Sequence, residues 1–122
     1  MTKSLKPNCD CIVRRGGEVI GTIKLSGRVL WALLSLMREG ERGCTPITRP
    51  APRWSHYIHQ LRTVYNINVE TINEGHEGVF SGTHARYVLR DQTSLFGGNL
   101  TEYLMSPDGR REFPNANFLG AH

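Results

Sequence analysis

The feature that most constrains the fold is an apolar stripe with helical spacing in the middle of the chain, within Arg53–Tyr65. Its members recur at i, i+4, i+7 and i+11, and they are Trp54, Ile58, Leu61 and Tyr65. This period predicts an amphipathic helix with one buried face. The opposite face is polar or basic, and no Asp or Glu occurs between Arg42 and Arg62. A helix of this kind is suited to lie against a polyanion, which makes it a candidate nucleic-acid recognition helix.

Two patterned segments precede this helix. The pair Gly16-Gly17 separates the β-prone runs Cys11–Arg15 and Glu18–Leu25, which predicts a β-hairpin. A wide apolar stripe then predicts a helix of about three turns over Arg28–Glu39. The candidate caps are Ser26 or Gly27 at its start and Gly40 or Gly43 at its end.

The segments around and after the central helix carry different signals. Three prolines, Pro46, Pro50 and Pro52, require any helix between the two predicted helices to be short or distorted. The runs Ile67–Ile72 and Ala85–Arg90 predict two strands that form a hairpin with a Gly-rich tip from Glu74 to His84. From residue 91 onward isolated apolar residues stand among glycines and prolines, and we expect an irregular extension. The expected division is 1–25, a tail and β-hairpin; 26–90, the central domain; and 91–122, the extension.

Several spacings in the central domain agree with one family. They are Leu33-x-x-Leu36-x-Arg38-x-Gly40-x-x-Gly43-x-Thr45, then Arg53-x-x-x-x-Ile58-x-x-Leu61-Arg62, then Ile67-x-Val69-Glu70-Thr71, then Ala85-Arg86-Tyr87-Val88-Leu89. This resembles the small winged-helix domains found in bacterial and phage or prophage proteins. There, a helix ending in Gly-x-x-Gly-x-Thr leads to a recognition helix ending in Leu-Arg and then to two strands. The resemblance covers roughly residues 28–90. The chain departs from it where members carry an Ala/Leu-rich second helix and this sequence has Thr45–Pro52.

The resemblance implies an α+β fold, a winged helix-turn-helix, here with an added N-terminal β-hairpin and an irregular C-terminal extension. In such a domain the recognition helix enters the major groove and the hairpin wing touches the backbone or the minor groove. The base-reading candidates are Gln60, Ser55, His56 and His59, the phosphate-contacting candidates are Arg49, Arg53 and Arg62, and the wing candidates are His84 and Arg86.

Each of these roles has a structural alternative. The side chains of Gln60, His56 and His59 can belong to an ordinary solvated helix face, and Arg62 can pair with Glu70. Carboxylates near the wing tip, such as that of Glu74, would be repelled by DNA. Trp31 and Trp54, on the apolar stripes of the two helices, are expected in the core.

The charge is distributed unevenly along the chain. Residues 1–65 carry a balance of +7 and residues 66–122 a balance of −3, which together make the net charge of +4. The positive half contains the predicted recognition helix, so electrostatics would turn this helix toward an acidic partner. A merely solvated basic face would produce the same asymmetry.

Other classes of protein have little support. Three cysteines are an odd number and do not suggest a disulfide framework. The spacings Cys9-x-Cys11 and His56-x-x-His59 do not conform to zinc motifs, and no phosphate-binding loop or nucleophile elbow occurs. We therefore expect no metal, no cofactor and no enzymatic activity. The start of the chain lacks the apolar segment of a signal peptide, and the longest apolar run, Val29–Met37, is too short to span a bilayer, so we expect a cytoplasmic protein without a membrane segment.

Two functions remain open at this point. The first is a winged-helix protein that binds double-stranded DNA, a transcriptional regulator of phage or prophage type, with the option of a homodimer formed through its terminal extensions. The second is a protein-interaction module, such as a phage-encoded inhibitor or assembly factor, built on the same scaffold, because function belongs to the site and not to the fold.

Overall fold

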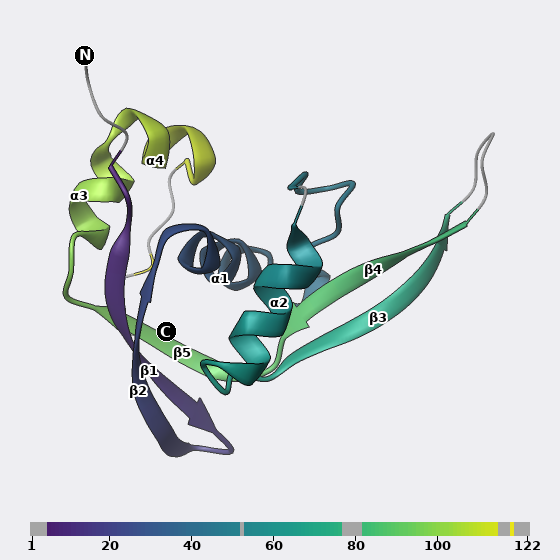
Figure 1. The fold of residues 1–122 in the computed structure, drawn as a ribbon, viewed down its shortest axis with the longest axis horizontal. Helices are drawn as coiled ribbons and strands as arrows, with labels where there is room; N and C mark the ends of the chain where they lie inside the picture. Colours follow the sequence, from purple (N-terminus) through teal and green to yellow (C-terminus); the bar gives the residue numbers. More distant parts are fainter. Residues whose placement is uncertain (1–4, 52, 77–81, 115–117, 119–122) are drawn as a thin grey trace.

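The computed structural model describes residues 5–51, 53–76, 82–114 and 118 of the chain. The helices and strands in chain order (Figure 1) are β1 (Asn8–Arg15), β2 (Glu18–Ser26), α1 (Gly27–Glu39), the 3-10 helix η1 (Gly40–Arg42), α2 (Trp54–Thr63), β3 (Val69–His76), β4 (Gly82–Leu89), β5 (Gln92–Phe96), α3 (Leu100–Met105) and α4 (Pro107–Glu112). Within the described residues, no helix is both long and apolar enough to cross a membrane.

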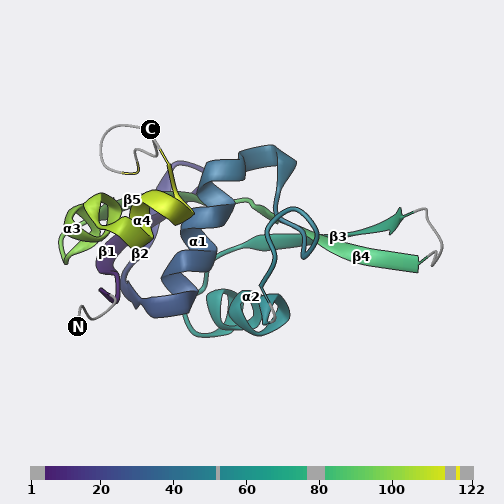
Figure 2. The ribbon, with the colours of Figure 1, turned by 90° about the horizontal axis from the view of Figure 1, so that it is seen from above.

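Helix α1 is the centre of the core. It begins after Ser26, and its C-cap is Gly40. Gly40 has a φ of 56°, a backbone conformation that glycine adopts more readily than other residues. Seen from above, α1 lies between α2 on one side and α3 with α4 on the other (Figure 2). Trp31 of α1 lies 5.4 Å from Trp54 of α2, and Trp54 lies 5.9 Å from Tyr87 of β4, measured between ring centroids. These three buried rings join both helices to the wing, and the expected core positions of the two tryptophans are confirmed.

Strands β3 and β4 form an antiparallel hairpin that projects away from the helices as the wing (Figure 1). Its register runs from the pair Val69 and Leu89 at the base to the pair His76 and Gly82. The strands are shifted toward the tip by comparison with the expected runs, and residues 77–81 lie outside the described part. At the base, Cys44 and Tyr87 exchange two backbone hydrogen bonds of 2.9 Å. The segment after α1 is thereby attached to the wing.

The Pro-rich segment between α1 and α2 folds as a turn. The hydroxyl of Thr45 accepts hydrogen bonds from the backbone N–H groups of Ile47 and Thr48, at 3.1 and 2.9 Å. The carbonyl of Arg49 accepts a 2.6 Å hydrogen bond from Nε1 of Trp54, which fixes the end of the turn on the first residue of α2. Over residues 44–51 no helix is present, as the prolines predict.

The N-terminal hairpin is confirmed, and it belongs to a larger sheet. The strand order is β2-β1-β5, with β5 antiparallel to β1 from the pair Asp10 and Phe96 to the pair Arg14 and Gln92. A bulge interrupts the pairing of β1 with β2 between Val13 and Arg14.

The expectation of an irregular C-terminal extension is corrected by this sheet and by the two helices that follow it. Strand β5, α3 and α4 are regular, and they bury Leu95, Leu100, Tyr103 and Phe113 in the core around α1. Several apolar residues that look isolated in the sequence therefore form the buried side of these short elements, while Phe96 remains exposed.

A buried carboxylate ties the N-terminal sheet to the base of the wing. The guanidinium of Arg15 donates two hydrogen bonds to Asp91, at 2.8 and 2.7 Å, and the backbone N–H of Asn68 donates a third of 2.7 Å. The side chain of Asp91 is 1% exposed. Burial acts to raise the pKa of Asp91, but the hydrogen bonds from Arg15 and Asn68 and the Arg15 charge outweigh it and hold the pKa below its usual value.

Candidate nucleic-acid interface

The amphipathic helix expected in the middle of the chain is confirmed as α2. Its buried residues are Trp54, Tyr57, Ile58 and Leu61. Because successive residues are rotated by about 100° around an α-helix, the remaining positions form one outward strip. The backbone N–H of Ile67 donates to the carbonyl of Leu61 after the helix, and Asn66 turns the chain with a φ of 55°.

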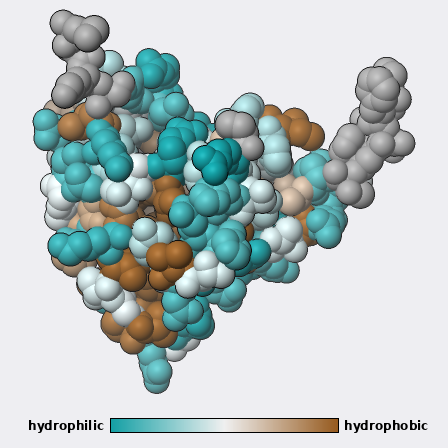
Figure 3. Space-filling model, in the orientation of Figure 1, coloured by the Kyte–Doolittle hydropathy of each residue, from teal (hydrophilic) through white to brown (hydrophobic). Residues whose placement is uncertain are grey.

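Five of the predicted site residues lie together on the outward strip of α2. The side chains of Arg53, Ser55, His56 and His59 are exposed and that of Gln60 is half-buried. Figure 3 shows hydrophilic surface over this helix, beside a hollow in the same face of the molecule. None of the five has an ion pair with another of the described residues, so their polar groups face solvent or a partner.

Arg62 has a different setting. Its Nε and Nη2 donate to the backbone carbonyl of Val69, at 2.9 and 2.6 Å, and Nη2 also donates to the hydroxyl of Thr71 at 2.6 Å. The expected alternative of a pair with Glu70 does not form, because Glu70 is bound to Arg90 across the wing. Arg62 thus joins the end of α2 to β3.

Arg49 points inward, contrary to the expectation of a phosphate contact. Its side chain is 15% exposed, and its Nη2 lies 3.3 Å from a carboxylate oxygen of Glu112. Its Nε donates to the hydroxyl of Ser35 at 3.2 Å, and the guanidinium lies 4.9 Å from the ring centroid of Trp31 and 4.8 Å from that of Phe113. Burial, and secondly the charge of Arg38, lowers the pKa of Arg49. The reason for the inward position is that α1 and α4 together provide acceptors that no local sequence pattern shows.

The two wing candidates are also engaged within the protein. Nε of Arg86 donates to Glu74 at 2.9 Å, and its Nη1 donates to the backbone carbonyls of Glu41 and Arg42. Nε2 of His84 lies 3.4 Å from the other carboxylate oxygen of Glu74. Both side chains therefore fasten the wing, Arg86 to η1 and His84 to the neighbouring strand.

These pairings change the meaning of the charge asymmetry. Carboxylates of the acidic half are paired with arginines as Arg15–Asp91, Arg49–Glu112, Arg86–Glu74 and Arg90–Glu70. Arg15 and Arg49 of the basic half are thus neutralised by carboxylates of the acidic half, whereas Arg86 and Arg90 form pairs within the acidic half. The outward strip of α2, with Arg53 and two histidines, keeps its positive or polarisable groups unpaired within the described residues.

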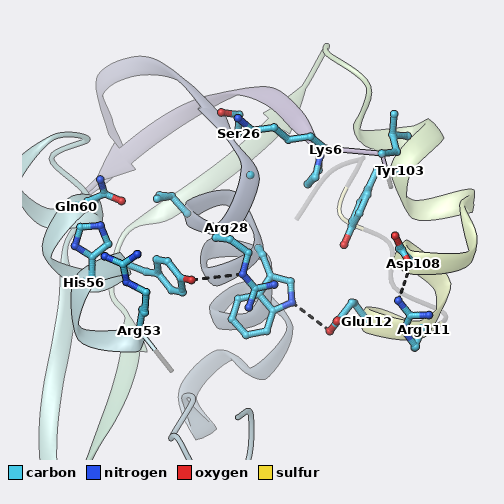
Figure 4. A pocket seen from close by; sticks show the side chains of 16 residues that line it. Lys6, Ser26, Arg28, Arg53, His56, Gln60, Tyr103, Asp108, Arg111 and Glu112 are labelled. Atoms are coloured by element: carbon cyan, nitrogen blue, oxygen red, sulfur yellow. Dashed lines mark hydrogen bonds and ion pairs between the residues drawn. The ribbon is translucent and has the colours of Figure 1, made fainter. Parts of the chain in front are cut away.

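A pocket borders the strip and contains residues that the sequence analysis missed. It has a volume of about 590 Å³ and lies between α2, the start of α1, and α4. Arg53, His56 and Gln60 line it from α2, while Lys6 and Arg28 are further cations on its wall (Figure 4). No sequence signal identifies these two, because the wall is assembled from segments up to about a hundred residues apart.

The cysteines and histidines do not form a cluster in the described part of the chain. The three cysteines are free and buried, in agreement with the absence of a disulfide framework. Burial raises the pKa of Cys9 to about 12, that of Cys11 to about 11 and that of Cys44 to about 12. Among the described residues no group of three potential metal ligands comes together, and the expectation that no metal is bound stays a prediction.

The chain runs from α1 through the bridge at Cys44 to α2 and then to the two-stranded wing, an arrangement of the winged-helix class of domains. A family model described as a winged helix domain matches residues 22–98, well over half of the 122-residue chain. The chain therefore belongs to the winged helix domain family, as its motifs predict, and the match includes β5, beyond the residues that carry the resemblance. No curated protein and no solved structure shows a significant match to the chain.

Proposed function

We propose that this winged-helix protein binds double-stranded DNA through α2 and acts as a transcriptional regulator of phage or prophage type. The observation that carries the proposal is the outward strip of α2, which is exposed, free of carboxylates and unpaired within the described residues. A helix of this width fits the major groove of B-form DNA.

The roles proposed for the strip follow from side-chain chemistry. Gln60 can pair with adenine through the oxygen and the nitrogen of its side-chain amide, and Ser55, His56 and His59 can donate to or accept from base edges. Arg53, at the start of the helix, is placed to contact a phosphate. Arg49, Arg62, His84 and Arg86 are left out of this interface because their side chains are bound within the protein.

The direct test is a titration of fluorescein-labelled mixed-sequence duplex with the purified protein, followed by anisotropy at two salt concentrations. Each phosphate contact, that of Arg53 included, would weaken binding roughly 3- to 4-fold between about 50 and about 200 mM salt, because bound counterions are released. Absence of binding at the lower salt would refute the proposal.

A paired substitution tests the reading face. Arg53→Glu together with Gln60→Ala should weaken DNA binding by roughly tenfold or more, since a bidentate base contact alone contributes about 1–3 kcal/mol. The matched control is Arg110→Glu, a charge reversal at an exposed arginine of α4 that does not line the pocket beside α2. Circular dichroism checks that both variants fold. Equal affinities of the two variants would show that α2 is not the reading face.

A second candidate function is a protein-interaction module, such as a phage-encoded inhibitor or assembly factor. It is favoured by exposed apolar side chains on the N-terminal sheet, where Val19 and Phe96 are 57% and 44% exposed. Figure 3 shows apolar surface near the end of the β1–β2 hairpin. A homodimer through this sheet is one form of such an interaction, and light scattering coupled to size-exclusion chromatography measures it. Failure to bind DNA together with a defined oligomer would favour this second function.

A further inference from the structure

The pocket beside α2 has the size and the mixed lining of a small-molecule site. Its volume of about 590 Å³ lies within the range of about 300–1,000 Å³ that is typical of ligand pockets. Figure 4 shows Arg53, His56 and Gln60 on one side, Tyr103, Asp108 and Glu112 on the other, and Arg28 between them. The pocket is therefore walled by four segments of the chain, within residues 5–7, 26–31, 53–60 and 103–112.

Arg28 is a positioned cation without a carboxylate partner among the described residues. Its guanidinium lies 4.2 Å from the ring centroid of Trp31 and 5.9 Å from that of Tyr57, and its Nε is 3.5 Å from the hydroxyl of Tyr57. Contacts with aromatic rings orient a guanidinium while its other N–H groups remain available. Lys6 and Arg53 add positive charge to the same lining, whereas Arg111 is paired with Asp108.

Tyr103 places a second polar group in the pocket. Its side chain is only 5% exposed, yet its hydroxyl has no hydrogen bond within the described part of the chain and points toward the middle of the pocket (Figure 4). Burial, and then the carboxylates of Glu112 and Asp108, raises the pKa of Tyr103, so the hydroxyl stays protonated and can donate. The ring is buried, but the hydroxyl oxygen is accessible from the pocket, so a ligand oxygen can accept its hydrogen bond.

The two carboxylates of the pocket indicate which kind of anion fits. Asp108 is bound to Arg111, and Glu112 to Arg49 and to Nε1 of Trp31, so neither neutralises Arg28. Their remaining lone pairs can accept hydrogen bonds from hydroxyl or amino groups. The pocket thus presents cations on the side of α1 and α2, and acceptors on the side of α4.

We propose that this pocket binds a nucleoside monophosphate, with the phosphate at Arg28 and Arg53 and the sugar hydroxyls and base toward Tyr103 and Asp108. A phosphate monoester supplies the charge that the cations need, since guanidinium groups form strong charge-assisted hydrogen bonds with it. The sugar and base supply donors for the acceptors on α4 and a planar ring of a size that the pocket accommodates. A continuous nucleic-acid strand fits less well, because its repeated charges would meet both carboxylates.

The test is isothermal titration calorimetry of the full chain with adenosine monophosphate, in the absence of DNA. Two control ligands are titrated in parallel. Adenosine has the base and sugar without the phosphate, and inorganic phosphate has the charge without the nucleoside. We expect adenosine monophosphate to bind more tightly than either fragment. No heat of binding from the monophosphate at concentrations up to about 5 mM, or equal affinity for adenosine, would overturn the proposal.

Two variants test the assigned residues. Arg28→Ala should weaken the binding of adenosine monophosphate by roughly ten- to a hundredfold, whereas Arg110→Ala, an exposed arginine outside the pocket, should leave it unchanged. Tyr103→Phe keeps the buried ring and removes only the hydroxyl, and a severalfold loss is expected. If Arg28→Ala and Arg110→Ala bind with the same affinity, or if Tyr103→Phe binds as tightly as the unchanged protein, the assignment is wrong.

The pocket shares Arg53, His56 and Gln60 with the outward strip of α2. Ligand binding should therefore affect DNA binding, an expectation that rests on the proposed function. Adding adenosine monophosphate to the DNA titration should then change the affinity for DNA, and Arg28→Ala should remove this change. Because the calorimetry contains no DNA, ligand binding and DNA binding can fail independently.

Discussion

The carboxylate of Glu112 joins α4 to both α1 and the turn before α2, and its removal should destabilise the protein measurably. One of its oxygens accepts a 3.2 Å hydrogen bond from Nε1 of Trp31 and lies 3.3 Å from Nη2 of Arg49. Its backbone carbonyl also accepts 3.0 Å hydrogen bonds from Arg38 and Arg49, and these survive any substitution of the side chain. Glu112→Ala therefore removes one hydrogen bond and one ion pair and leaves the helix anchored by its backbone.

The size of the effect follows from the burial of the two partners. The side chains of Arg49 and Glu112 are 15% and 34% exposed, so the pair is less screened than a surface pair of about 0–1 kcal/mol and more screened than a buried one of about 3–5 kcal/mol. We take about 1–2 kcal/mol for the pair and about 1 kcal/mol for the Trp31 hydrogen bond. The free energy of unfolding should fall by about 2–3 kcal/mol, which for a chain of this length lowers Tm by roughly 10 °C.

Urea unfolding followed by tryptophan fluorescence measures this change. Glu112→Gln keeps an acceptor oxygen for Trp31 and removes the charge, so it should lose about half as much stability. Glu102→Ala, at an exposed position of α3, is the matched control and should change stability by less than about 0.5 kcal/mol. If Glu112→Ala is as stable as Glu102→Ala, the ion pair does not brace the turn and the reasoning fails.

Two further substitutions test other parts of the fold. Gly43 has φ 70° and ψ 179°, and a Cβ there would lie 2.6 Å from the carbonyl oxygen of Tyr87. Gly43→Ala should therefore lower the free energy of unfolding in urea by roughly 2 kcal/mol or more. An unchanged urea midpoint would contradict the bridge between this segment and β4. Asp91 has a lowered pKa in the folded state, so its contribution is complete above its ordinary pKa of about 3.9 and is lost as the pH falls through its lower folded value. The stability difference between the unchanged protein and Asp91→Asn should therefore be constant near neutral pH and shrink only in acid, and a difference that grows in acid would refute the Arg15–Asp91 assignment.

The central helices and the wing could be predicted because their signals are local. Most apolar residues of α1 and three of the four residues in the stripe of α2 are buried, and the turn at residues 16 and 17 lies where the glycines place it. The C-terminal elements gave no comparable signal. Strand β5 has five residues and α3 and α4 have six each, too few to repeat an apolar period, and β5 is defined by pairing with β1 about eighty residues earlier in the chain.

The candidate site was predictable only in part, for a physical reason. Periodicity indicates which residues of α2 face outward, so Arg53, His56 and His59 could be placed from sequence. It does not indicate where a guanidinium will find acceptors. An arginine has five N–H donors and no acceptor, and tertiary folding brings carbonyls and carboxylates within reach of Arg49 and Arg62. A basic residue near a recognition helix is thus a weaker indication of a phosphate contact than its charge suggests.

The departure from the family pattern and the regular C-terminal extension are two parts of one arrangement. A recognition helix must be held rigidly, and in the resembling domains a second helix does this. Three prolines exclude a regular helix here, so the turn must be held from outside itself. Its anchors are the hydrogen bond from Trp54 to Arg49 and the contacts of Arg49 with Glu112 and Phe113 at the end of α4. Helix α4 therefore contributes at long range part of the support that a second helix would give locally. It follows that truncation before α4 would loosen α2 as well as remove the extension.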